Sequence, residues 1–310
     1  MSKFLVTGGA GFIGSHIVDR LVQLKYRVKV LDNFSSGRKE NLCKSLSKID
    51  LVRGDIRSKE ACRKATKGME VVLHQAALRS VPKSLVNPAI YNEVNIQGTL
   101  NLLQAAVENK VSCFVFASSS SVYGDLKDFP EKTDFLPQPI SPYALTKLAG
   151  EHYCRMFSCH YNLPTVSLRY FNVFGPRQSL DDEYAVVVPK FIDCMLHDEQ
   201  PPIYGTGKQS RDFTFVSNVV DANLLACPKR NLKGDVFNIA AGRDYSVLDL
   251  VRLLNKIIGK NIRPVFLKLR PGDVFRTMAD ISLSRKILGF RPKINFEEGL
   301  NIALKYYKEQ

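Results

Sequence analysis

Two side chains that can act together as a base stand four residues apart, where a helix is expected to begin. Tyr143 and Lys147 lie in the segment Ser-Pro-Tyr-Ala-Leu-Thr-Lys, and this spacing places both on one helical face. A free tyrosine, with a pKa near ~10, is a poor base at neutral pH, whereas a cation beside it lowers that pKa. A pKa of ~7 requires about 4 kcal/mol, which one close cation and a second positive group can supply. The pair therefore predicts a tyrosine that removes a proton from a substrate.

The same Tyr-x-x-x-Lys pattern occurs at two other places in the chain, Tyr123–Lys127 and Tyr204–Lys208. Glycines interrupt both of these segments, Gly124 in the first and Gly205 and Gly207 in the second. Glycine disfavours a helix, so neither pair is expected to share a helical face. The helix-compatible context therefore favours the pair at 143 and 147.

A glycine-rich turn follows the first expected strand. Gly8, Gly11 and Gly14 allow a tight turn, a close approach of the backbone to a pyrophosphate, and close packing of the following helix on the strand. That helix offers unpaired N–H groups and the positive end of its dipole to phosphates. The pattern predicts a dinucleotide site, because it lies between a strand and a helix.

Acidic residues follow the next two expected strands. Asp32, followed by Asn33, ends the second strand, where a carboxylate accepts hydrogen bonds from both ribose hydroxyls and repels a 2′-phosphate. Asp55 and Ile56 come just after the third strand and suit an adenine contact or a plain turn. These positions predict NAD rather than NADP as the cofactor.

The elements that position these residues follow from the hydrophobic pattern. In the first half, short apolar runs without proline alternate with stretches of helical periodicity, which predicts a parallel sheet covered on both faces. We expect strands over residues 3–7, 27–31, 50–53, 71–74, 112–117 and 165–170, and helices over residues 13–24, 59–67, 92–109 and 142–161. Beyond Asn172 we expect helices over residues 187–197, 216–227, 246–258 and 296–308, and extended segments over residues 201–203 and 236–240.

The predicted fold class is α/β, a Rossmann-type doubly wound parallel sheet with a smaller, interleaved C-terminal α/β substrate domain. Residues 1–171 form the predicted NAD-binding domain, to which residues 213–240 return. Residues 172–212 and 241–310 form the predicted substrate domain. The two are expected to share a cleft at the carboxyl ends of the strands.

Composition limits the classes of partner. The 310 residues are 45% hydrophobic and 24% charged, which is ordinary for a soluble globular protein. No apolar run approaches the ~20 residues of a membrane span, and no signal-peptide core precedes the first strand. The net charge of +14 is spread along the chain and interleaved with acids, so we expect no nucleic-acid partner. Seven scattered cysteines without a CxxC pair predict reduced thiols in the cytoplasm and no metal site.

Together, these segments resemble the extended short-chain dehydrogenase/reductase family, and within it the nucleotide-sugar 4-epimerases. The resemblance covers nearly the whole chain and implies NAD in the Rossmann half and a UDP-sugar in the other. The segments that carry it are the glycine turn, Asp55-Ile56, His74 to Ala77, the serine run before Val122-Tyr123-Gly124, the pair Tyr143 and Lys147, Arg169 to Arg177, Gly205-Thr206-Gly207, Ser210 to Phe213, and Arg270 to Asp273.

The resemblance also implies roles for individual residues. Tyr143 would be the base, Lys147 its pKa-lowering partner and a ligand of the nicotinamide ribose, and Ser119 (or Ser120) the partner of the sugar 4-hydroxyl. The implied cofactor-binding residues are Gly8, Gly11, Phe12, Ile13, Gly14, Asp32, Asn33, Asp55, Ile56, Ala76, Ala77, Arg79, Asn95, Tyr143 and Lys147. The implied substrate-binding residues are Ser119, Ser120, Asn172, Arg211, Arg270, Asp273 and Thr277, with Arg211 and Arg270 as a diphosphate clamp.

The implied reaction transfers a hydride twice. The Tyr143 phenolate removes the 4-hydroxyl proton while NAD takes the C4 hydride, and the 4-keto sugar then receives the hydride on its other face. Related 4,6-dehydratases carry an Asp-Glu pair where this chain has Ser120-Ser121, and UDP-glucuronate decarboxylases carry a Glu at the position of Ser120. Epimerisation, which needs neither, is the predicted reaction.

The preferred sugar depends on Thr277. Epimerases limited to glucose and galactose often carry a tyrosine there, and a small residue leaves room for an N-acetyl group at C2. With the segment from Arg79 to Ser84, this is most similar to the UDP-N-acetylglucosamine 4-epimerases, although UDP-glucose and UDP-galactose are possible substrates. UDP-glucuronate is the alternative substrate, and a non-catalytic NAD- or RNA-binding Rossmann protein is the alternative class. The resemblance further implies a homodimer, in which the helices over 92–109 and 142–161 form a four-helix bundle.

Overall fold

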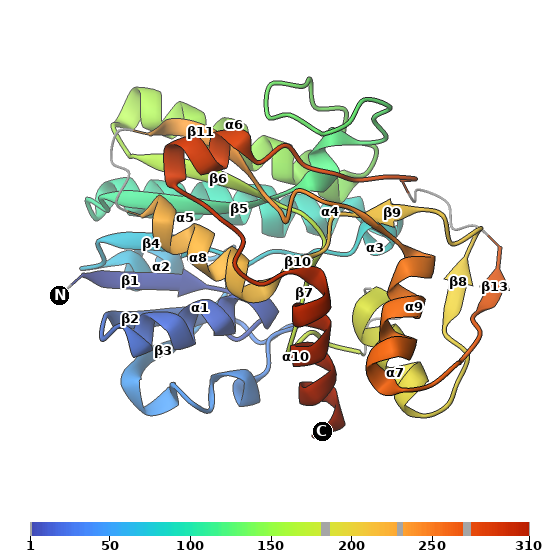
Figure 1. Ribbon diagram of the computed structural model, residues 1–310. Coiled ribbons are helices and arrows are strands. Elements are labelled where there is room, and N and C mark those ends of the chain that lie inside the picture. The colour runs from blue at the N-terminus through green and yellow to red at the C-terminus, as the bar shows by residue number, and fades with distance from the viewer. Residues whose placement is uncertain (1, 181–186, 228–231, 269–273, 310) are drawn as a thin grey trace.

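The structure is a computed structural model that describes residues 2–180, 187–227, 232–268 and 274–309. Within these ranges, the central strands are β1 (Lys3–Thr7), β2 (Arg27–Asp32), β3 (Ile49–Arg53), β4 (Val71–His74), β5 (Cys113–Ser119), β6 (Thr165–Tyr170) and β11 (Lys233–Ile239). They form one parallel sheet in the order β11-β6-β5-β4-β1-β2-β3 (Figure 1). The predicted Rossmann-type doubly wound sheet is confirmed.

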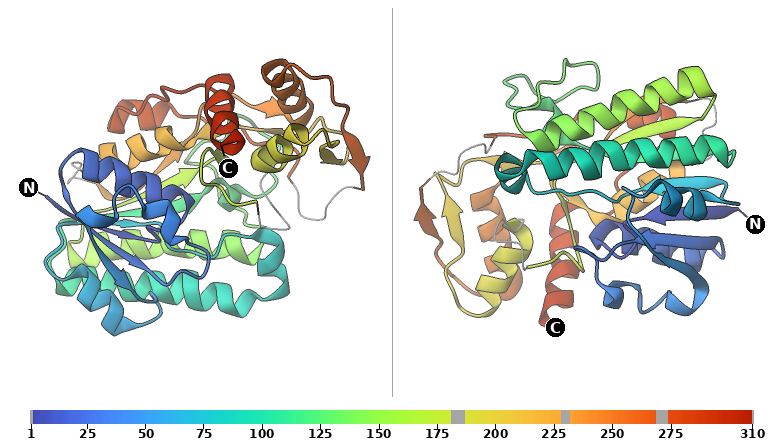
Figure 2. Two further views of the ribbon diagram at one scale, coloured as in Figure 1. Left: turned by 90° about the horizontal axis from the view of Figure 1, so that it is seen from below. Right: turned by 180° about the vertical axis from the view of Figure 1, so that it is seen from behind.

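Apolar side chains occupy both faces of the strands, because helices cover the sheet on both sides. In β1, Phe4 and Val6 pack with α1 (Phe12–Gln23) and α8 (Val216–Ala226), whereas Leu5 belongs to the core on the opposite face. That opposite face is covered by α2 (Lys59–Thr66), α5 (Gly98–Glu108) and α6 (Pro142–Tyr161). α5 and α6 lie side by side across it (Figure 2).

The expected helix over residues 92–109 begins in a different form. Residues Asn92–Gln97 make a π-helix, η3, which leads directly into α5. The short helices α3 (Val81–Val86) and α4 (Pro88–Tyr91) come before it and were not predicted, and the side chain of the preceding residue caps each of them. The 3-10 helices η1 (Lys39–Leu42), η2 (Leu46–Lys48) and η4 (Ser120–Tyr123) and the π-helix η5 (Ser284–Leu288) complete the short elements.

Another core lies beyond the carboxyl ends of the central strands, where most of the C-terminal elements gather (Figure 1). Phe174, Phe213, Phe215 and Phe296 meet there, and the rings of Phe213 and Phe296 stack with centroids 4.7 Å apart. Its helices are α7 (Val187–Leu196), α9 (Val247–Ile258) and α10 (Phe296–Lys308). Its paired strands are β7 (Val173–Phe174) with β10 (Thr214–Phe215), β8 (Pro202–Tyr204) with β13 (Val265–Leu267), and β9 (Ser210–Arg211) with β12 (Tyr245–Ser246).

The chain returns to the central sheet after this core begins. α8 packs against α1, and β11 pairs with β6 at the edge of the sheet. The segment immediately before α8, Phe213 to Phe215, instead contributes its rings to the C-terminal core. The domain boundaries given above stay a prediction.

α6 approaches β5 closely at Gly150. A Cβ on this residue would stand 2.3 Å from the ring of Phe116, so only glycine fits this contact without a shift. Glycine costs about 1 kcal/mol relative to alanine inside a helix, and close packing explains its presence here. The approach also brings the Lys147 side chain to β5, where its ammonium donates to the carbonyl oxygen of Ala117 at 2.8 Å.

We expect Gly150→Ala to destabilise the protein, because the added methyl group must displace Phe116 or α6. The cost of overpacking exceeds the gain in helix propensity, so the net loss should be about 1–2 kcal/mol. Urea denaturation followed by circular dichroism measures this change. Lys305→Ala, at an exposed position of α10, is the control and should stay within about 0.5 kcal/mol. A Gly150→Ala protein as stable as the parent would contradict the close contact.

Candidate active site

A cavity of about 1600 Å³ opens at the carboxyl ends of the central strands. Its volume exceeds the ~300–1,000 Å³ of ordinary ligand pockets, so it can hold a cofactor and a substrate together. The predicted residues that line it are Gly8, Gly11, Phe12, Ile13, Gly14, Asp32, Asn33, Asp55, Ile56, Ala76, Ala77, Arg79, Ser119, Ser120, Tyr143, Lys147, Asn172, Arg211 and Thr277. Arg270 and Asp273 lie outside the described residues, so their predicted contact with a diphosphate stays a prediction.

The glycine turn forms a cradle that side chains would fill. Gly8 has a φ of +65°, and a Cβ there would lie 2.7 Å from the nitrogen of Ala76. A Cβ on Gly14 would lie 2.1 Å from the carbonyl oxygen of Gly8. At Gly11, the N-cap of α1, a Cβ would meet only the Gly8 oxygen, and no side chain caps the helix. The first N–H groups of α1 therefore stay available to a pyrophosphate, as the predicted cofactor requires.

Asp32 is held at the end of β2 by backbone donors. Its carboxylate oxygens accept one hydrogen bond each, from the N–H of Ala10 at 2.9 Å and the N–H of Phe34 at 2.8 Å. Burial raises the pKa of this carboxyl group, and the two hydrogen bonds oppose that rise. Each oxygen keeps a further lone pair, so the carboxylate fits the predicted contact with ribose hydroxyls.

Asp55 lines the cavity, but its carboxylate is already committed. Arg57 donates three hydrogen bonds to it from Nε, Nη2 and its backbone N–H, and Asn33 donates a fourth from Nδ2. These bonds, chiefly those from Arg57, lower the pKa of Asp55 to about 2. A carboxylate has about four lone-pair sites, so an adenine contact here would fall to the backbone of Asp55 or Ile56.

Among the predicted cofactor residues, Asn95 does not line the cavity, and its contact with NAD stays a prediction. It is 2% exposed and lies behind the cavity wall, where it accepts from the N–H of Leu78 and donates to the carbonyl of Leu78 and to the Thr146 hydroxyl. The Thr146 hydroxyl in turn donates to the carbonyl oxygen of Tyr143. Asn95 therefore joins the segment after β4 to the start of α6, which places it as a support of the site.

Ser119 and Tyr143 meet at the floor of the cavity. β5 alternates its side chains, so Ser118 donates to the buried Glu151, whereas Ser119 lines the cavity close to Tyr143 and lowers the pKa of that phenol. Ser121 donates two further hydrogen bonds to the Ser119 hydroxyl, from its backbone N–H and its own hydroxyl. This geometry favours Ser119 over Ser120 as the hydroxyl partner.

The predicted lowering of the Tyr143 pKa is not found in the protein alone. Burial raises the pKa of Tyr143, and the hydrogen bond with Ser119 and the charge of Arg79 oppose that rise. Lys147 Nζ lies 6.0 Å from the centroid of the Tyr143 ring. Burial also lowers the pKa of Lys147 to about 8, against the negative charge of Glu151. Tyr143 and Lys147 therefore lie on one helix as predicted, but burial has the largest effect on the pKa of the tyrosine.

At the other end of the cavity, Asn172 and Thr277 contact each other. Asn172 has a φ of +32°, and its side-chain nitrogen donates to the Thr277 hydroxyl at 2.9 Å. Arg211, whose guanidinium donates to the carbonyl oxygens of Ser210 and Phe275, lines the same region. The structure thus brings together predicted substrate residues that lie 105 positions apart in the chain.

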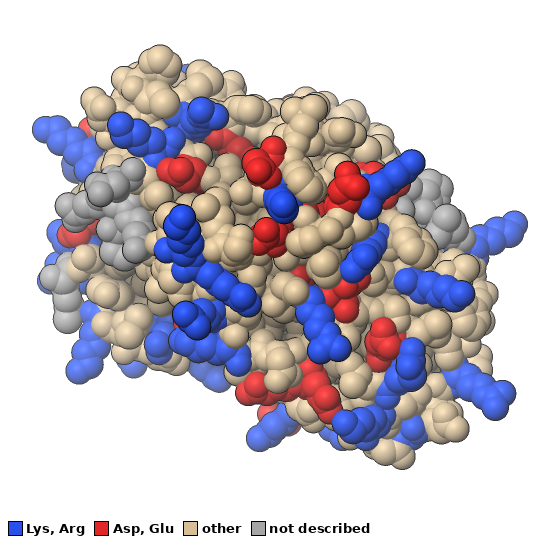
Figure 3. Space-filling model, turned by 45° about the horizontal axis from the view of Figure 1, so that its top comes forward, with Lys and Arg blue, Asp and Glu red and all other residues tan. Residues whose placement is uncertain are grey.

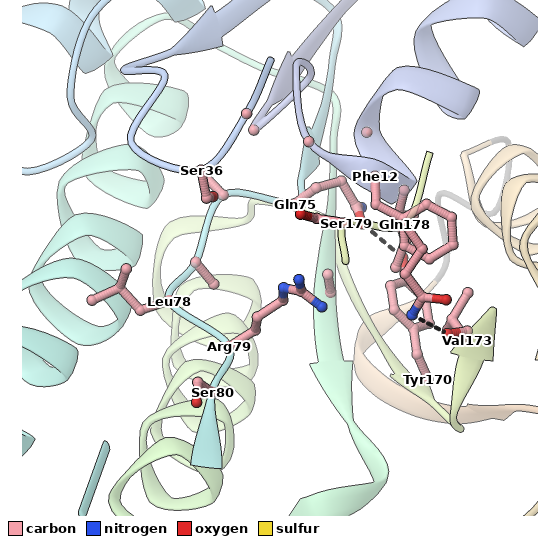
Figure 4. A pocket seen from close by; sticks show the side chains of 18 of the residues that line it. Phe12, Ser36, Gln75, Leu78, Arg79, Ser80, Tyr170, Val173, Gln178 and Ser179 are labelled. Atoms are coloured by element: carbon pink, nitrogen blue, oxygen red, sulfur yellow. Dashed lines mark hydrogen bonds between the residues drawn. The ribbon is translucent and has the colours of Figure 1, made fainter. Parts of the chain in front are cut away.

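Some residues that line the cavity were not predicted. Gln75 and Tyr170 lie on neighbouring wall positions, and the Tyr170 hydroxyl donates to the side-chain oxygen of Gln75 at 3.2 Å (Figure 4). Gln178, also not predicted, donates to the carbonyl oxygen of Val173, whereas the predicted residue Arg79 extends into the cavity (Figure 4). Gln75 and Tyr170 lie within segments that carry the family resemblance, and each stands at the end of a central strand. These positions could have indicated that they line the cavity.

On the face drawn in Figure 3, Lys and Arg are scattered, with Asp and Glu between them. None of the helices in the described ranges has the length and apolar character to cross a membrane. In the same ranges, no three His, Cys, Asp or Glu side chains gather as a metal site would require.

Comparisons with known proteins agree with this arrangement. Residues 4–240 match the model of the NAD dependent epimerase/dehydratase family. The structure is similar to that of a UDP-N-acetylglucosamine 4-epimerase from Methanobrevibacter ruminantium M1 in complex with UDP-N-acetylmuramic acid, with a TM-score of 0.95 and 39% identity over 100% of this chain and 99% of that one. It is also similar to a Thermotoga maritima UDP-glucose 4-epimerase with UDP-glucose, with a TM-score of 0.94 and 40% identity over 99% of each chain.

A further similar structure is that of a Bacillus cereus UDP-glucuronic acid 4-epimerase in complex with UDP-glucuronic acid and NAD. Its TM-score is 0.91, and it is 36% identical over 99% of each chain. The chain therefore belongs to the NAD dependent epimerase/dehydratase family, within the extended short-chain dehydrogenase/reductases. NAD is its cofactor, and the cradle at Gly8 and Gly14 and the free lone pairs of Asp32 fit that group.

Proposed function

We propose that this protein is a UDP-sugar 4-epimerase that inverts C4 of a UDP-hexose through a 4-keto intermediate. The observation that carries the proposal is the meeting of Ser119, Tyr143 and Lys147 on the floor of a cavity that also contains the glycine cradle. NAD, when bound there, supplies a hydride acceptor and a positive charge close to Tyr143. The similar proteins named above, with 4-epimerase activity in each name, support the same reaction class.

The residues of the chain divide the work of the proton transfer. Ser119 orients the sugar 4-hydroxyl toward Tyr143, because its own hydroxyl lies within hydrogen-bonding reach of that phenol. Tyr143 takes the proton from the 4-hydroxyl and later returns it. Lys147 holds a positive charge beside the ring, fixed by its hydrogen bond to Ala117, and so favours the phenolate. Ser120 and Ser121 stand where dehydratases have an acid and a base, which leaves reversible oxidation as the reaction.

Tyr143→Phe is expected to lower turnover strongly and to retain NAD, since it removes the proton acceptor and leaves the cradle intact. A general acid–base group contributes about 10²–10⁴-fold to rate, so the loss should fall in that range. The measurement is incubation with UDP-glucose, UDP-N-acetylglucosamine and UDP-glucuronate, without added NAD, followed by product identification. Tyr161→Phe, at the exposed end of the same helix, should behave as the parent. Full activity of Tyr143→Phe on any of the three sugars would contradict the mechanism.

For the sugar, we propose UDP-N-acetylglucosamine and UDP-N-acetylgalactosamine. Thr277 is small, lines the cavity beside Asn172, and leaves the space that a larger side chain would occupy. The name of the Methanobrevibacter relative supports this choice. UDP-glucuronate is the alternative: the positive charge of Arg79 acts on Tyr143, where it can also face a sugar carboxylate, and the Bacillus relative binds that sugar.

We expect Thr277→Tyr to change the choice of sugar. The phenol fills the space beside Asn172, so kcat/KM for UDP-N-acetylglucosamine should fall at least about tenfold relative to that for UDP-glucose. Thr277→Ser keeps the hydroxyl that accepts from Asn172 and should keep the ratio of the parent. Competition assays with both sugars measure the ratio. An unchanged ratio in Thr277→Tyr would show that Thr277 does not determine which C2 substituent is accepted.

A non-catalytic NAD- or RNA-binding protein is the alternative from another class. Its discriminating result is salt-sensitive RNA binding together with no turnover of any of the three UDP-sugars. The assembled Ser119, Tyr143 and Lys147 support an enzyme instead.

Each of the seven cysteines is a free thiol, which supports the cytoplasm as the location, and cell fractionation tests this.

We further propose a homodimer in which η3, α5 and α6 pair with the same helices of a second copy. Leu145 and Met156 are 54% and 49% exposed on α6. With Ala149 and His152 they form one stripe at four- and three-residue spacing, which is typical of a helix-packing face. An apolar stripe of this kind is stabilised when a second helix pair covers it.

Charges on this stripe are expected to separate the two copies. Leu145→Glu combined with Met156→Glu places carboxylates in the proposed interface, so sedimentation equilibrium should show a change from dimer to monomer. Ile302→Glu, which changes an exposed apolar residue of α10, is the control and should keep the mass of the parent. A monomeric parent, or a dimeric double variant, would contradict the proposed interface.

A further inference from the structure

Glu151 is a buried carboxylate that takes no part in the proposed proton transfer. α6 carries Tyr143, Lys147 and Glu151 at four-residue spacing, so the three side chains share one face of the helix. Lys147 and Glu151 are each 5% exposed. An ionised carboxylate is kept in such a place only when partners compensate for its lost hydration.

The partners of Glu151 come from the two neighbouring strands. Arg169 on β6 donates two hydrogen bonds to it, from Nε at 2.9 Å and from Nη2 at 2.8 Å, and Ser118 on β5 donates a third. Arg169 and Ser118 are register partners in the sheet. Ala117, the residue before Ser118, accepts the Lys147 ammonium. The same strand end therefore fixes both the ammonium and the carboxylate.

Glu151 acts on Lys147 through its charge. Burial lowers the pKa of Lys147 to about 8, and among the described residues Glu151 is the group whose charge opposes that change. The other titratable groups around this pair are Tyr143 and Cys154 on α6, His74 on β4, Arg169 on β6 and Tyr123 on η4, with its ring 4.6 Å from the Arg169 guanidinium.

Apart from Tyr143, whose ionisation Lys147 is proposed to assist, these surrounding groups do not provide another anion near pH 7. Burial, with the charge of Lys147, lowers the pKa of His74 to about 3, so this ring is neutral. Burial raises the pKa of Tyr123 to about 12 and also raises the pKa of the Cys154 thiol. Among the described groups that face the pair, Glu151 is therefore the anion that can hold a proton on Lys147.

We propose that Glu151 is a positioning residue for Lys147. Clamped by Arg169 and Ser118, it holds a fixed negative charge one helical turn from the ammonium and keeps that ammonium charged beside Tyr143. The inference rests on the proposed function, because a charged Lys147 matters only if Tyr143 is the base. An ion pair that merely joined α6 to β6 would instead affect stability and leave Lys147 unchanged.

Glu151→Gln and Glu151→Asp separate charge from geometry. The glutamine has the shape of the parent side chain without its charge, so the pKa of Lys147 should fall by about one unit. The shorter aspartate disturbs the two-point contact with Arg169 but keeps the charge, so it should leave that pKa near the value of the parent. NMR titration of the NAD-containing protein labelled with ¹³C- and ¹⁵N-lysine measures it, with Lys147→Arg used to assign the signal.

Enzyme kinetics give a second readout. Because Lys147 must be charged, activity is lost as the pH rises through its pKa, so a lower pKa moves the alkaline limb of kcat to lower pH. Glu151→Gln should move this limb by the same amount as the NMR titration, with little change in KM. The control is Glu108→Gln, which removes the exposed two-point ion pair of Glu108 with Arg63 and should move neither.

The outcomes separate the two explanations. A Glu151→Gln protein with a lower unfolding temperature and an unmoved Lys147 titration overturns the proposal. If that variant does not fold, Glu151→Met combined with Arg169→Met removes both charges without leaving one unpaired, and a smaller downward shift is expected because the loss of the Arg169 charge opposes it. A protein that shows the Lys147 shift but turns over no UDP-sugar would refute the proposed function and leave this inference standing.

Discussion

The chemistry of the site depends on one contact, the packing of α6 against β5. Gly150 lets the helix approach the Phe116 ring, and this approach brings the Lys147 ammonium to the carbonyl oxygen of Ala117. The same contact that fixes the position of the ammonium also removes it from water, which lowers its pKa to about 8. Position and charge of the cation are therefore not independent: a looser helix would hydrate Lys147 but would no longer hold it beside Tyr143.

The parallel arrangement of the strands places the other cavity residues around this contact. The carboxyl ends of β1, β2, β4, β5 and β6 meet at one edge of the sheet, so the glycine turn, Asp32, Gln75, Ser119 and Tyr170 line one cavity. Chain segments more than a hundred residues apart are brought within hydrogen-bonding distance there, as with Asn172 and Thr277. Cofactor and substrate must share this edge, because both depend on groups that follow the strands.

Much of this could be predicted from the sequence, because strand alternation, glycine spacing and the Tyr143–Lys147 interval are local patterns. What could not be predicted depends on contacts between distant segments. The fourth hydrogen bond to the Asp55 carboxylate comes from Asn33, which lies 22 positions away in the chain. The place of Asn95 depends on its hydrogen bonds with Leu78 and Thr146. The rise of the Tyr143 pKa through burial could not be predicted for the same reason: burial is a property of the whole fold, whereas the spacing showed only the cation.

The proposed catalytic residues and the proposed determinant of sugar choice are held by different parts of the chain. Ser119 and Lys147 are fixed by the central sheet, whereas Thr277 is placed by connections that Asp212 holds together. The Asp212 carboxylate accepts from the N–H groups of Ala241, Gly242 and Ala279, and the Asp212 N–H donates to the Thr277 hydroxyl. Since these bonds do not involve the sheet-bound groups, a change at Thr277 can alter which sugar fits without moving the base. If Thr277 selects the sugar as proposed, the same arrangement of Ser119, Tyr143 and Lys147 could act on different UDP-sugars, because the selecting residue lies in connections that Asp212 holds.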